Sequence, residues 1–126
     1  MQSLARLGTR DLKRAKAYYD EIAATLGARA VMATEDQVSY RGAGDAVFII
    51  GLPVGGGDAT VGHGTQIGFA APDRASVDAA YARAMELGSK SEGAPAVRGP
   101  VEHGFYNCYF RDPDGNKLLV FHSPAA

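Results

Sequence analysis

The C-terminal part of the chain has the plainest pattern of apolar and polar positions. Residues 105–111 and 117–122 are rich in aromatic and branched side chains, and the segment between them favours a tight turn. The pattern predicts two antiparallel strands. Alternation divides their larger side chains into one set with Tyr106, Cys108, Phe110, Leu118, Val120 and His122, and another with Phe105, Asn107, Tyr109, Arg111, Lys117, Leu119 and Phe121. Both faces carry apolar groups, so we expect a helix on the first face and a different role for the second.

Two other segments change to the three- and four-residue spacing of an amphipathic helix. The first runs from Asp11 to Gly27 and the second from Asp73 to Gly88. In each segment the aspartate is suited to capping the start and the glycine to ending the helix. The two segments match in length, apolar stripe and terminator at an offset of about 61 residues, which indicates an internal duplication.

The remaining apolar runs predict strands around each helix. These strands cover residues 2–9, 28–34, 37–41, 46–51 and 65–71, whereas residues 89–103 predict a loop with room for a short edge strand. The sequence therefore predicts one α+β domain, residues 1–126, built from two βαβββ modules at 1–53 and 64–126 and a glycine-rich linker at 54–63. With one helix outside each module, we expect the two uncovered faces to form a cupped mixed sheet with a cleft.

The side chains predicted to face the cleft are apolar and aromatic with a few polar groups, as is typical of a pocket for a small organic ligand. Arg6 is suited to pairing with an anionic substituent, and Gln66 and Asn107 to fixing orientation through hydrogen bonds. The alternative is that these side chains only fill the cleft or a dimer seam. The candidate ligand-binding residues are Leu4, Arg6, Phe48, Gln66, Phe105, Asn107, Tyr109, Leu119 and Phe121.

Composition narrows the class of partner. The chain has 126 residues, of which 46% are apolar and 21% charged, so one domain can bury a core without a metal or disulfide staple. A formal net charge of −1 with scattered basic residues predicts neither a nucleic-acid partner nor a membrane partner. The single cysteine cannot form an internal disulfide, and no apolar run is long enough for a signal peptide or a membrane span. We therefore expect a cytoplasmic protein.

The titratable side chains offer one candidate catalyst. His63, His103 and His122 share no metal-ligand spacing, so we expect structural or surface roles for most of them. His103 is the candidate for acid–base catalysis, because it enters the predicted hairpin from a loop and an imidazole titrates near neutral pH. Cys108 falls on the predicted helix-facing side of its strand, which favours a buried and inert thiol.

Three segments resemble the vicinal oxygen chelate superfamily, which includes glyoxalase I, bleomycin resistance proteins, fosfomycin resistance enzymes and extradiol dioxygenases. Residues 110–118 (FRDPDGNKL) resemble the last hairpin of the family, residues 11–19 (DLKRAKAYY) its first helix and residues 71–77 (APDRASV) its second. The resemblance covers nearly the whole chain. It implies paired βαβββ modules, a cupped sheet, a small-molecule site inside it and a homodimer.

The same resemblance identifies where metal ligands would lie. Metal-dependent members hold a divalent ion through His, Glu or Gln side chains from four cavity strands. The corresponding positions here are Leu4, the apolar segment 48–50, Gln66 and Leu119, so Gln66 is the only surviving candidate ligand. We therefore expect no metal or cofactor, and a protein that binds a small apolar or aromatic molecule as sequestering resistance proteins do. The alternatives are a metal-dependent glyoxalase-like lyase, isomerase or dioxygenase with His103 as the base, and a structural dimer without a ligand.

Overall fold

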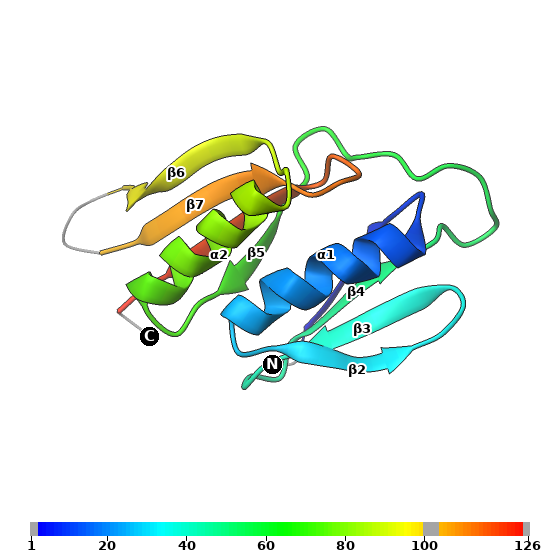
Figure 1. Ribbon diagram of the computed structural model, residues 1–126, viewed down its shortest axis with the longest axis horizontal. Helices are drawn as coiled ribbons and strands as arrows, with labels where there is room; N and C mark the ends of the chain where they lie inside the picture. Colours follow the sequence, from blue (N-terminus) through cyan, green and yellow to red (C-terminus); the bar gives the residue numbers. More distant parts are fainter. Residues whose placement is uncertain (1–2, 100–103, 125–126) are drawn as a thin grey trace.

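The computed structural model describes residues 3–99 and 104–124, and these form two βαβββ modules (Figure 1). The first module consists of β1 (Leu4–Gly8), α1 (Leu12–Thr25), β2 (Arg29–Ala33), β3 (Gln37–Arg41) and β4 (Val47–Gly51). The second consists of β5 (Ile67–Ala70), α2 (Arg74–Glu86), β6 (Ser91–Val97), β7 (Tyr106–Arg111) and β8 (Lys117–His122). The α+β fold class predicted from the duplicated pattern is confirmed.

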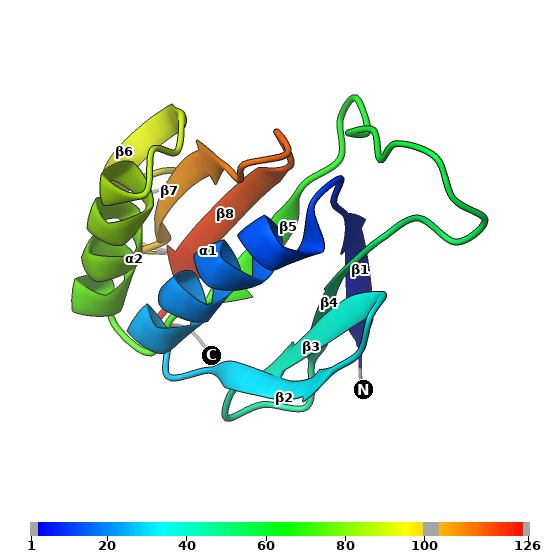
Figure 2. The ribbon, with the colours of Figure 1, turned by 45° about the vertical axis from the view of Figure 1, so that its right-hand side comes forward.

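Each module contains a four-stranded mixed sheet of the same topology. The strand orders are β1-β4-β3-β2 and β5-β8-β7-β6, with β1 parallel to β4 and β5 parallel to β8. Figure 2 shows these two sheets as separate units, with the helices α1 and α2 on them. The connection between the modules, residues 52–66, contains no helix or strand.

Both helices begin and end where their capping residues predict. The carboxylates of Asp11 and Asp73 each accept a hydrogen bond from a backbone N–H three residues further on. Gly27 and Gly88 follow the helices with φ angles of 70° and 90°, a left-handed conformation that glycine adopts without a steric cost. Within the described ranges, neither helix has the length and apolar character needed to cross a membrane.

Strand β6 is longer than the sequence predicts. The segment 89–103 suggested a loop with a short edge strand, yet Ser91–Val97 forms a seven-residue strand paired with β7. Pro95 is compatible with this position because β6 is an edge strand, so the backbone N–H that proline lacks is not needed to pair with a second neighbouring strand. The pairing shifts register on either side of Gly93, which explains the weak alternation of the segment.

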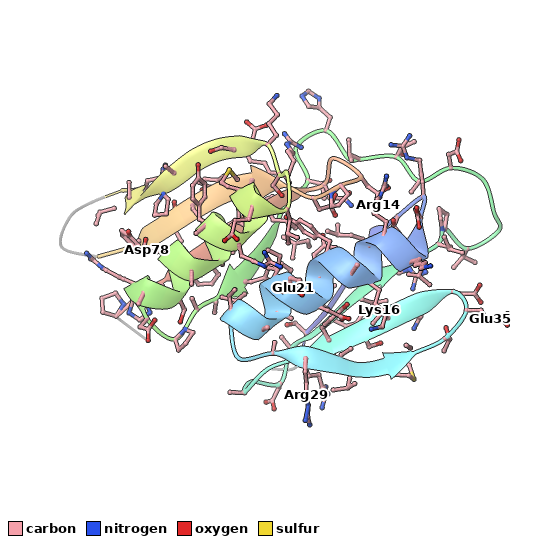
Figure 3. The ribbon with its side chains drawn as sticks, in the orientation of Figure 1. Arg14, Lys16, Glu21, Arg29, Glu35 and Asp78 are labelled. Atoms are coloured by element: carbon pink, nitrogen blue, oxygen red, sulfur yellow. The ribbon has the colours of Figure 1, made fainter. Side chains whose placement is uncertain are left out.

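A single apolar core joins the two modules on the helix-covered side of their sheets. Helices α1 and α2 lie side by side in Figure 1, and their charged edges meet where Glu21 of α1 lies 3.2 Å from Nη2 of Arg83. Glu21 is labelled in Figure 3. In the core, the ring of Phe48 on β4 lies 5.0 Å from that of Phe69 on β5, so aromatic packing crosses the module boundary.

The turn between β7 and β8 also binds the modules together. Asp114 accepts hydrogen bonds from the Thr9 hydroxyl at 2.5 Å and from the Arg14 guanidinium at 3.0 Å, both next to the start of α1. Asn116 donates from its amide nitrogen to the carbonyl oxygen of Gly8 at 3.0 Å. The Asp-Pro-Asp-Gly-Asn turn therefore contributes both the hairpin geometry and a polar contact between modules.

Candidate functional site

The face of the second sheet that α2 does not cover carries most of the predicted ligand-binding side chains. In the register of β7 and β8, Asn107 pairs with Phe121 and Tyr109 with Leu119, so these four lie on one face, which we call the open face. Tyr109, Leu119 and Phe121 are half-buried. The side chains on the other face, by contrast, are fully buried against α2: Cys108, Phe110, Leu118 and Val120. The predicted division of the hairpin into two faces is confirmed.

Gly68, which has no side chain, leaves space between the large side chains of the open face. Gly68 on β5 pairs with Leu119, and a Cβ atom there would lie 3.2 Å from the Phe121 ring and 3.4 Å from Leu119. The Phe105 ring lies 5.5 Å from that of Phe121, at the end of β7. The result is an apolar, aromatic surface on which a flat organic group could lie against Gly68.

Arg98 belongs to this face, although the sequence did not predict it. It follows β6, and its Nη1 donates to the carbonyl oxygen of Asn107 at 2.5 Å and to Oδ1 of the same residue at 2.8 Å. Its Nη2 donates to the carbonyl oxygen of Ala94 at 2.8 Å. Gly93 makes room for the guanidinium, because a Cβ atom there would lie 2.8 Å from Nη2. Arg98 is thus held across the sheet by three hydrogen bonds.

Two cations flank the aromatic ring at the centre of the open face. The guanidinium carbon of Arg98 lies 5.6 Å from the centroid of the Tyr109 ring, and the Lys117 ammonium lies 5.0 Å from it. Asn107, which Arg98 contacts, is only 1% exposed, and its Nδ2 is the one buried side-chain nitrogen or oxygen without a hydrogen-bond partner in the described part of the chain. The face therefore combines apolar contact area with hydrogen-bond donors.

Phe48 lies on the opposite face from the one we predicted. Its ring is 5.0 Å from that of Tyr19 on α1, which places it in the helix-covered core. The β4 residue on the uncovered face is Ile49, which pairs with Arg6 on β1 and Ser39 on β3. The prediction was wrong because residues 47–50 are all apolar. Without a polar residue in this segment, alternation does not show which residues of β4 face the core and which face the other side.

The other candidates of the first module lie on the uncovered face of their own sheet. Leu4 is 65% exposed. Arg6 is exposed but not free, since its Nη1 donates to the Gln37 side chain at 2.5 Å and its Nη2 to the carbonyl oxygen of Leu52 at 2.7 Å. Gly51 provides the space for this arrangement, because a Cβ atom there would lie 2.5 Å from Nη2. Arg6 is therefore already engaged by the protein itself.

The metal-ligand positions of the resembled family do not fit a metal in this chain. Leu4, Ile49 and Leu119 lie on the uncovered faces of β1, β4 and β8 and have no atom that binds a cation. Gln66 is exposed and precedes β5. Across residues 3–99 and 104–124, no group of three or more His, Cys, Asp or Glu side chains is placed to share an ion.

Among the described residues, His63, His122 and Cys108 share no site. His103 lies outside the described residues, so its catalytic role stays a prediction. His122 contacts the carbonyl oxygen of Ala71 through Nδ1 at 3.1 Å, and His63 is exposed in the inter-module connection. Burial raises the pKa of the Cys108 thiol to about 11, so it is protonated and unreactive at neutral pH.

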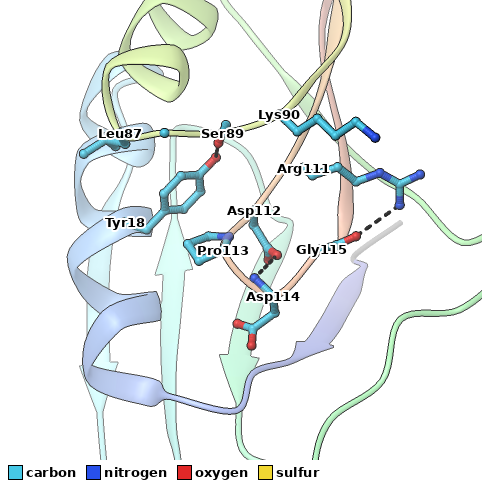
Figure 4. Close-up of a pocket in the computed structure, with 10 residues that line it drawn as sticks. Tyr18, Leu87, Ser89, Lys90, Arg111, Asp112, Pro113, Asp114 and Gly115 are labelled. Carbon is cyan, nitrogen blue, oxygen red and sulfur yellow. Dashed lines mark hydrogen bonds between the residues drawn. The ribbon is translucent and has the colours of Figure 1, made fainter.

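A pocket of about 440 Å³ lies elsewhere, between the end of α2, α1 and the β7–β8 turn (Figure 4). The Tyr18 hydroxyl meets the Ser89 hydroxyl at 2.6 Å on one side of it, and Arg111 donates to the carbonyl oxygen of Gly115 at 3.1 Å on the other. None of the predicted ligand-binding residues lines this pocket. It is a groove at the module junction, separate from the open face.

The fold defines a protein of two paired βαβββ modules, each with one helix. A family model described as the Glyoxalase/Bleomycin resistance protein/Dioxygenase superfamily matches residues 3–120. The chain belongs to this superfamily, and the predicted family resemblance is confirmed.

Solved structures agree with this assignment. The chain is 34% identical to a glyoxalase/bleomycin resistance protein from Albidiferax ferrireducens T118, covering 98% of both chains with a TM-score of 0.87. It is 25% identical to lactoylglutathione lyase from Agrobacterium tumefaciens, covering 95% of this chain and 91% of that one with a TM-score of 0.68. A glyoxalase-related enzyme from Fulvimarina pelagi shares the fold at 20% identity, a TM-score of 0.73 and coverage of 97% and 87%. Among curated proteins, no sequence matches the chain.

Proposed function

We propose that the protein binds a small apolar or aromatic molecule on the open face of its second sheet, without the four-ligand metal site of metal-dependent superfamily members. The observation that carries the proposal is the half-buried aromatic and aliphatic surface of Tyr109, Leu119 and Phe121 around Gly68. Leu119, at the position where a metal-dependent member has a carboxylate, makes this surface a contact area for apolar groups. Binding of this kind gains free energy in proportion to the apolar area buried.

Calorimetry with a panel of small aromatic molecules tests this proposal, after a thermal-shift screen selects those that raise the melting temperature. We expect Leu119→Ala to lower the affinity for the selected molecules several-fold, because the substitution removes apolar contact area from the open face. The matched control is Val54→Ala, since Val54 is 94% exposed in the inter-module connection and should leave affinity unchanged. Equal affinities in both variants, or a panel with no binder, would contradict the proposal.

A metal-dependent lyase is the second candidate, supported by the likeness to lactoylglutathione lyase at 25% identity. In that case Gln66, which precedes β5 at the edge of the open face, would be one ligand. Metal analysis after gentle purification separates the two candidates. Stoichiometric Zn, Ni, Fe or Mn that is lost in Gln66→Ala would favour the lyase, whereas our first proposal expects no stoichiometric metal in either protein.

We also propose that the protein forms a homodimer in the cytoplasm. The support for the dimer is the exposed apolar side chains on the two outer strands of the first sheet, where Leu4 on β1 is 65% exposed and Val31 and Met32 on β2 are 47% and 52% exposed. The support for the compartment is the single cysteine, which cannot form an internal disulfide. Sedimentation velocity should show a dimer that Leu4→Asp weakens, and a monomer at all concentrations would contradict the dimer.

A further inference from the structure

We propose that the ligand of the open face carries a carboxylate, which Asn107 and Arg98 bind while the apolar part of the ligand lies on Leu119 and Phe121. This inference rests on the proposed function and narrows its ligand class. It starts from two neighbouring hydrogen-bond donors, Asn107 and Arg98, and from a further cation, Lys117, at the Tyr109 ring that Arg98 also approaches.

The first donor is Nδ2 of Asn107. The orientation of this amide is set by Arg98, whose Nη1 donates to Oδ1 at 2.8 Å, so the nitrogen is the atom left without a partner. A buried donor without an acceptor is costly, and proteins satisfy the great majority of such groups. An acceptor that arrives with a ligand would satisfy this one.

The second donor is the Arg98 guanidinium, which is already held in position. Of its five N–H groups, three bind Asn107 and Ala94, and the Nε group and one Nη2 group have no partner among the described residues. The three hydrogen bonds and the space above Gly93 fix the orientation of the group before a ligand binds. Binding an acid here therefore costs less side-chain entropy than binding it to a mobile arginine.

The further cation, Lys117, makes the local charge positive. Neither Lys117 nor Arg98 lies within 4.0 Å of a carboxylate in the part of the chain that the structure describes. The nearby Glu92 is engaged by Arg111 at 3.1 Å, and this hydrogen bond lowers the pKa of its carboxyl group. The centre of the face therefore offers donors and positive charge, which complement an anionic acceptor.

A planar carboxylate fits these donors better than a neutral acceptor does. Its two oxygens can accept one bond from the Asn107 amide and one from the guanidinium, whereas a neutral carbonyl group offers a single oxygen. Because Nδ2 is covered in the free protein, a neighbouring side chain must move to admit a ligand, and we expect this to be the half-buried Phe121, the direct cross-strand neighbour of Asn107. The ligand is thus an aromatic or aliphatic acid whose apolar part packs against Leu119 and the rotated Phe121 ring.

Matched pairs of ligands test the inference by calorimetry: 2-naphthoate against 2-naphthamide, and phenylacetate against phenylacetamide. For the unchanged protein we expect each acid to bind at least about 10-fold more tightly than its amide. Arg98→Gln and Lys117→Gln should each reduce this preference, and Asn107→Asp should abolish acid binding, because it keeps the acceptor for Arg98 but replaces the free donor with a negative charge. Arg29→Gln, an exposed cation on β2, is the matched control and should change nothing.

The outcomes separate this inference from the proposed function. If the amides bind as tightly as the acids, or if Asn107→Asp and Lys117→Gln leave the preference unchanged in folded protein, the acid-binding inference is wrong and the apolar site stands. If neither acids nor amides bind, both fail. A shift of the Asn107 side-chain amide signals in 1H–15N spectra upon addition of 2-naphthoate, but not upon addition of inorganic chloride, would locate the acid at the predicted donor.

Discussion

Replacing Asp112 with alanine should destabilise the protein more than any change on the open face. Asp112 is 5% exposed, and its carboxylate accepts four hydrogen bonds. Oδ2 accepts from the Tyr19 hydroxyl at 2.5 Å and from the Asn116 amide at 2.9 Å, and Oδ1 accepts from the backbone N–H groups of Asp114 and Asn116, both at 2.9 Å. One side chain therefore holds the β7–β8 turn together and ties it to α1.

The size of the expected loss in stability depends on which of these donors can find another hydrogen-bond partner in the Asp112→Ala variant. A hydrogen bond to a charged group contributes about 1.5–3 kcal/mol, and a buried donor left alone costs about 1–3 kcal/mol. The turn amides can bind water after the substitution, but the Tyr19 hydroxyl lies on a residue that is only 2% exposed. We therefore expect Asp112→Ala to lower the free energy of unfolding by about 3–5 kcal/mol. Tyr19→Phe, which removes one of the four donors, should cost about 1–2 kcal/mol.

Urea unfolding monitored by circular dichroism measures these values, and the Tyr19→Phe, Asp112→Ala double variant measures their coupling. Tyr40→Phe is the control, since its hydroxyl donates to the half-exposed Asp20 at 2.8 Å and its loss should cost about 1 kcal/mol or less. A loss below about 1 kcal/mol for Asp112→Ala, or one equal to that of the control, would show that the turn is not a structural contact between modules.

Two further predictions test the helix ends and the buried thiol. Gly88 has a φ angle of 90°, so Gly88→Ala should lower the free energy of unfolding by about 1 kcal/mol in the same urea assay. Gly44→Ala is the control, because no heavy atom lies within 4 Å of the added Cβ, and it should change the free energy of unfolding by no more than about 0.5 kcal/mol. Because burial raises the pKa of Cys108 to about 11, only a minute fraction is thiolate at pH 8, and Ellman's reagent should react at least about 100-fold more slowly with the folded protein than in urea. Rapid reaction of the folded protein would contradict that burial.

Most of the fold was predictable because each module repeats a simple local pattern. The helix spacings, the aspartate caps and the glycine terminators all act over a few residues, and the structure confirms them. The failures occurred where local pattern carries no information. Strand β4 is apolar on both faces, so the face of Phe48 could not be determined, and the bulges around Gly93 concealed β6.

The site was predictable only in part, for a physical reason. Alternation correctly placed Asn107, Tyr109, Leu119 and Phe121 on the open face, because the opposite set on β7 and β8 packs against α2. Arg98 was missed because it lies after β6 and reaches the face by folding back over Gly93. A basic residue that flanks a glycine-containing edge strand is the only signal in the sequence, and it does not reveal which way the side chain turns.

The β7–β8 turn indicates which superfamily the protein belongs to, whereas the open face is where we propose that its ligand binds. The Asp-Pro-Asp-Gly-Asn turn, which most clearly indicates the superfamily, uses its polar side chains for hydrogen bonds with Tyr19, Thr9 and Gly8. On the open face, Leu119 lies three residues after the turn ends, and its apolar side chain occupies the metal-ligand position of the family. The turn therefore accounts for the fold, whereas our proposal assigns the choice of ligand to the donors around Tyr109.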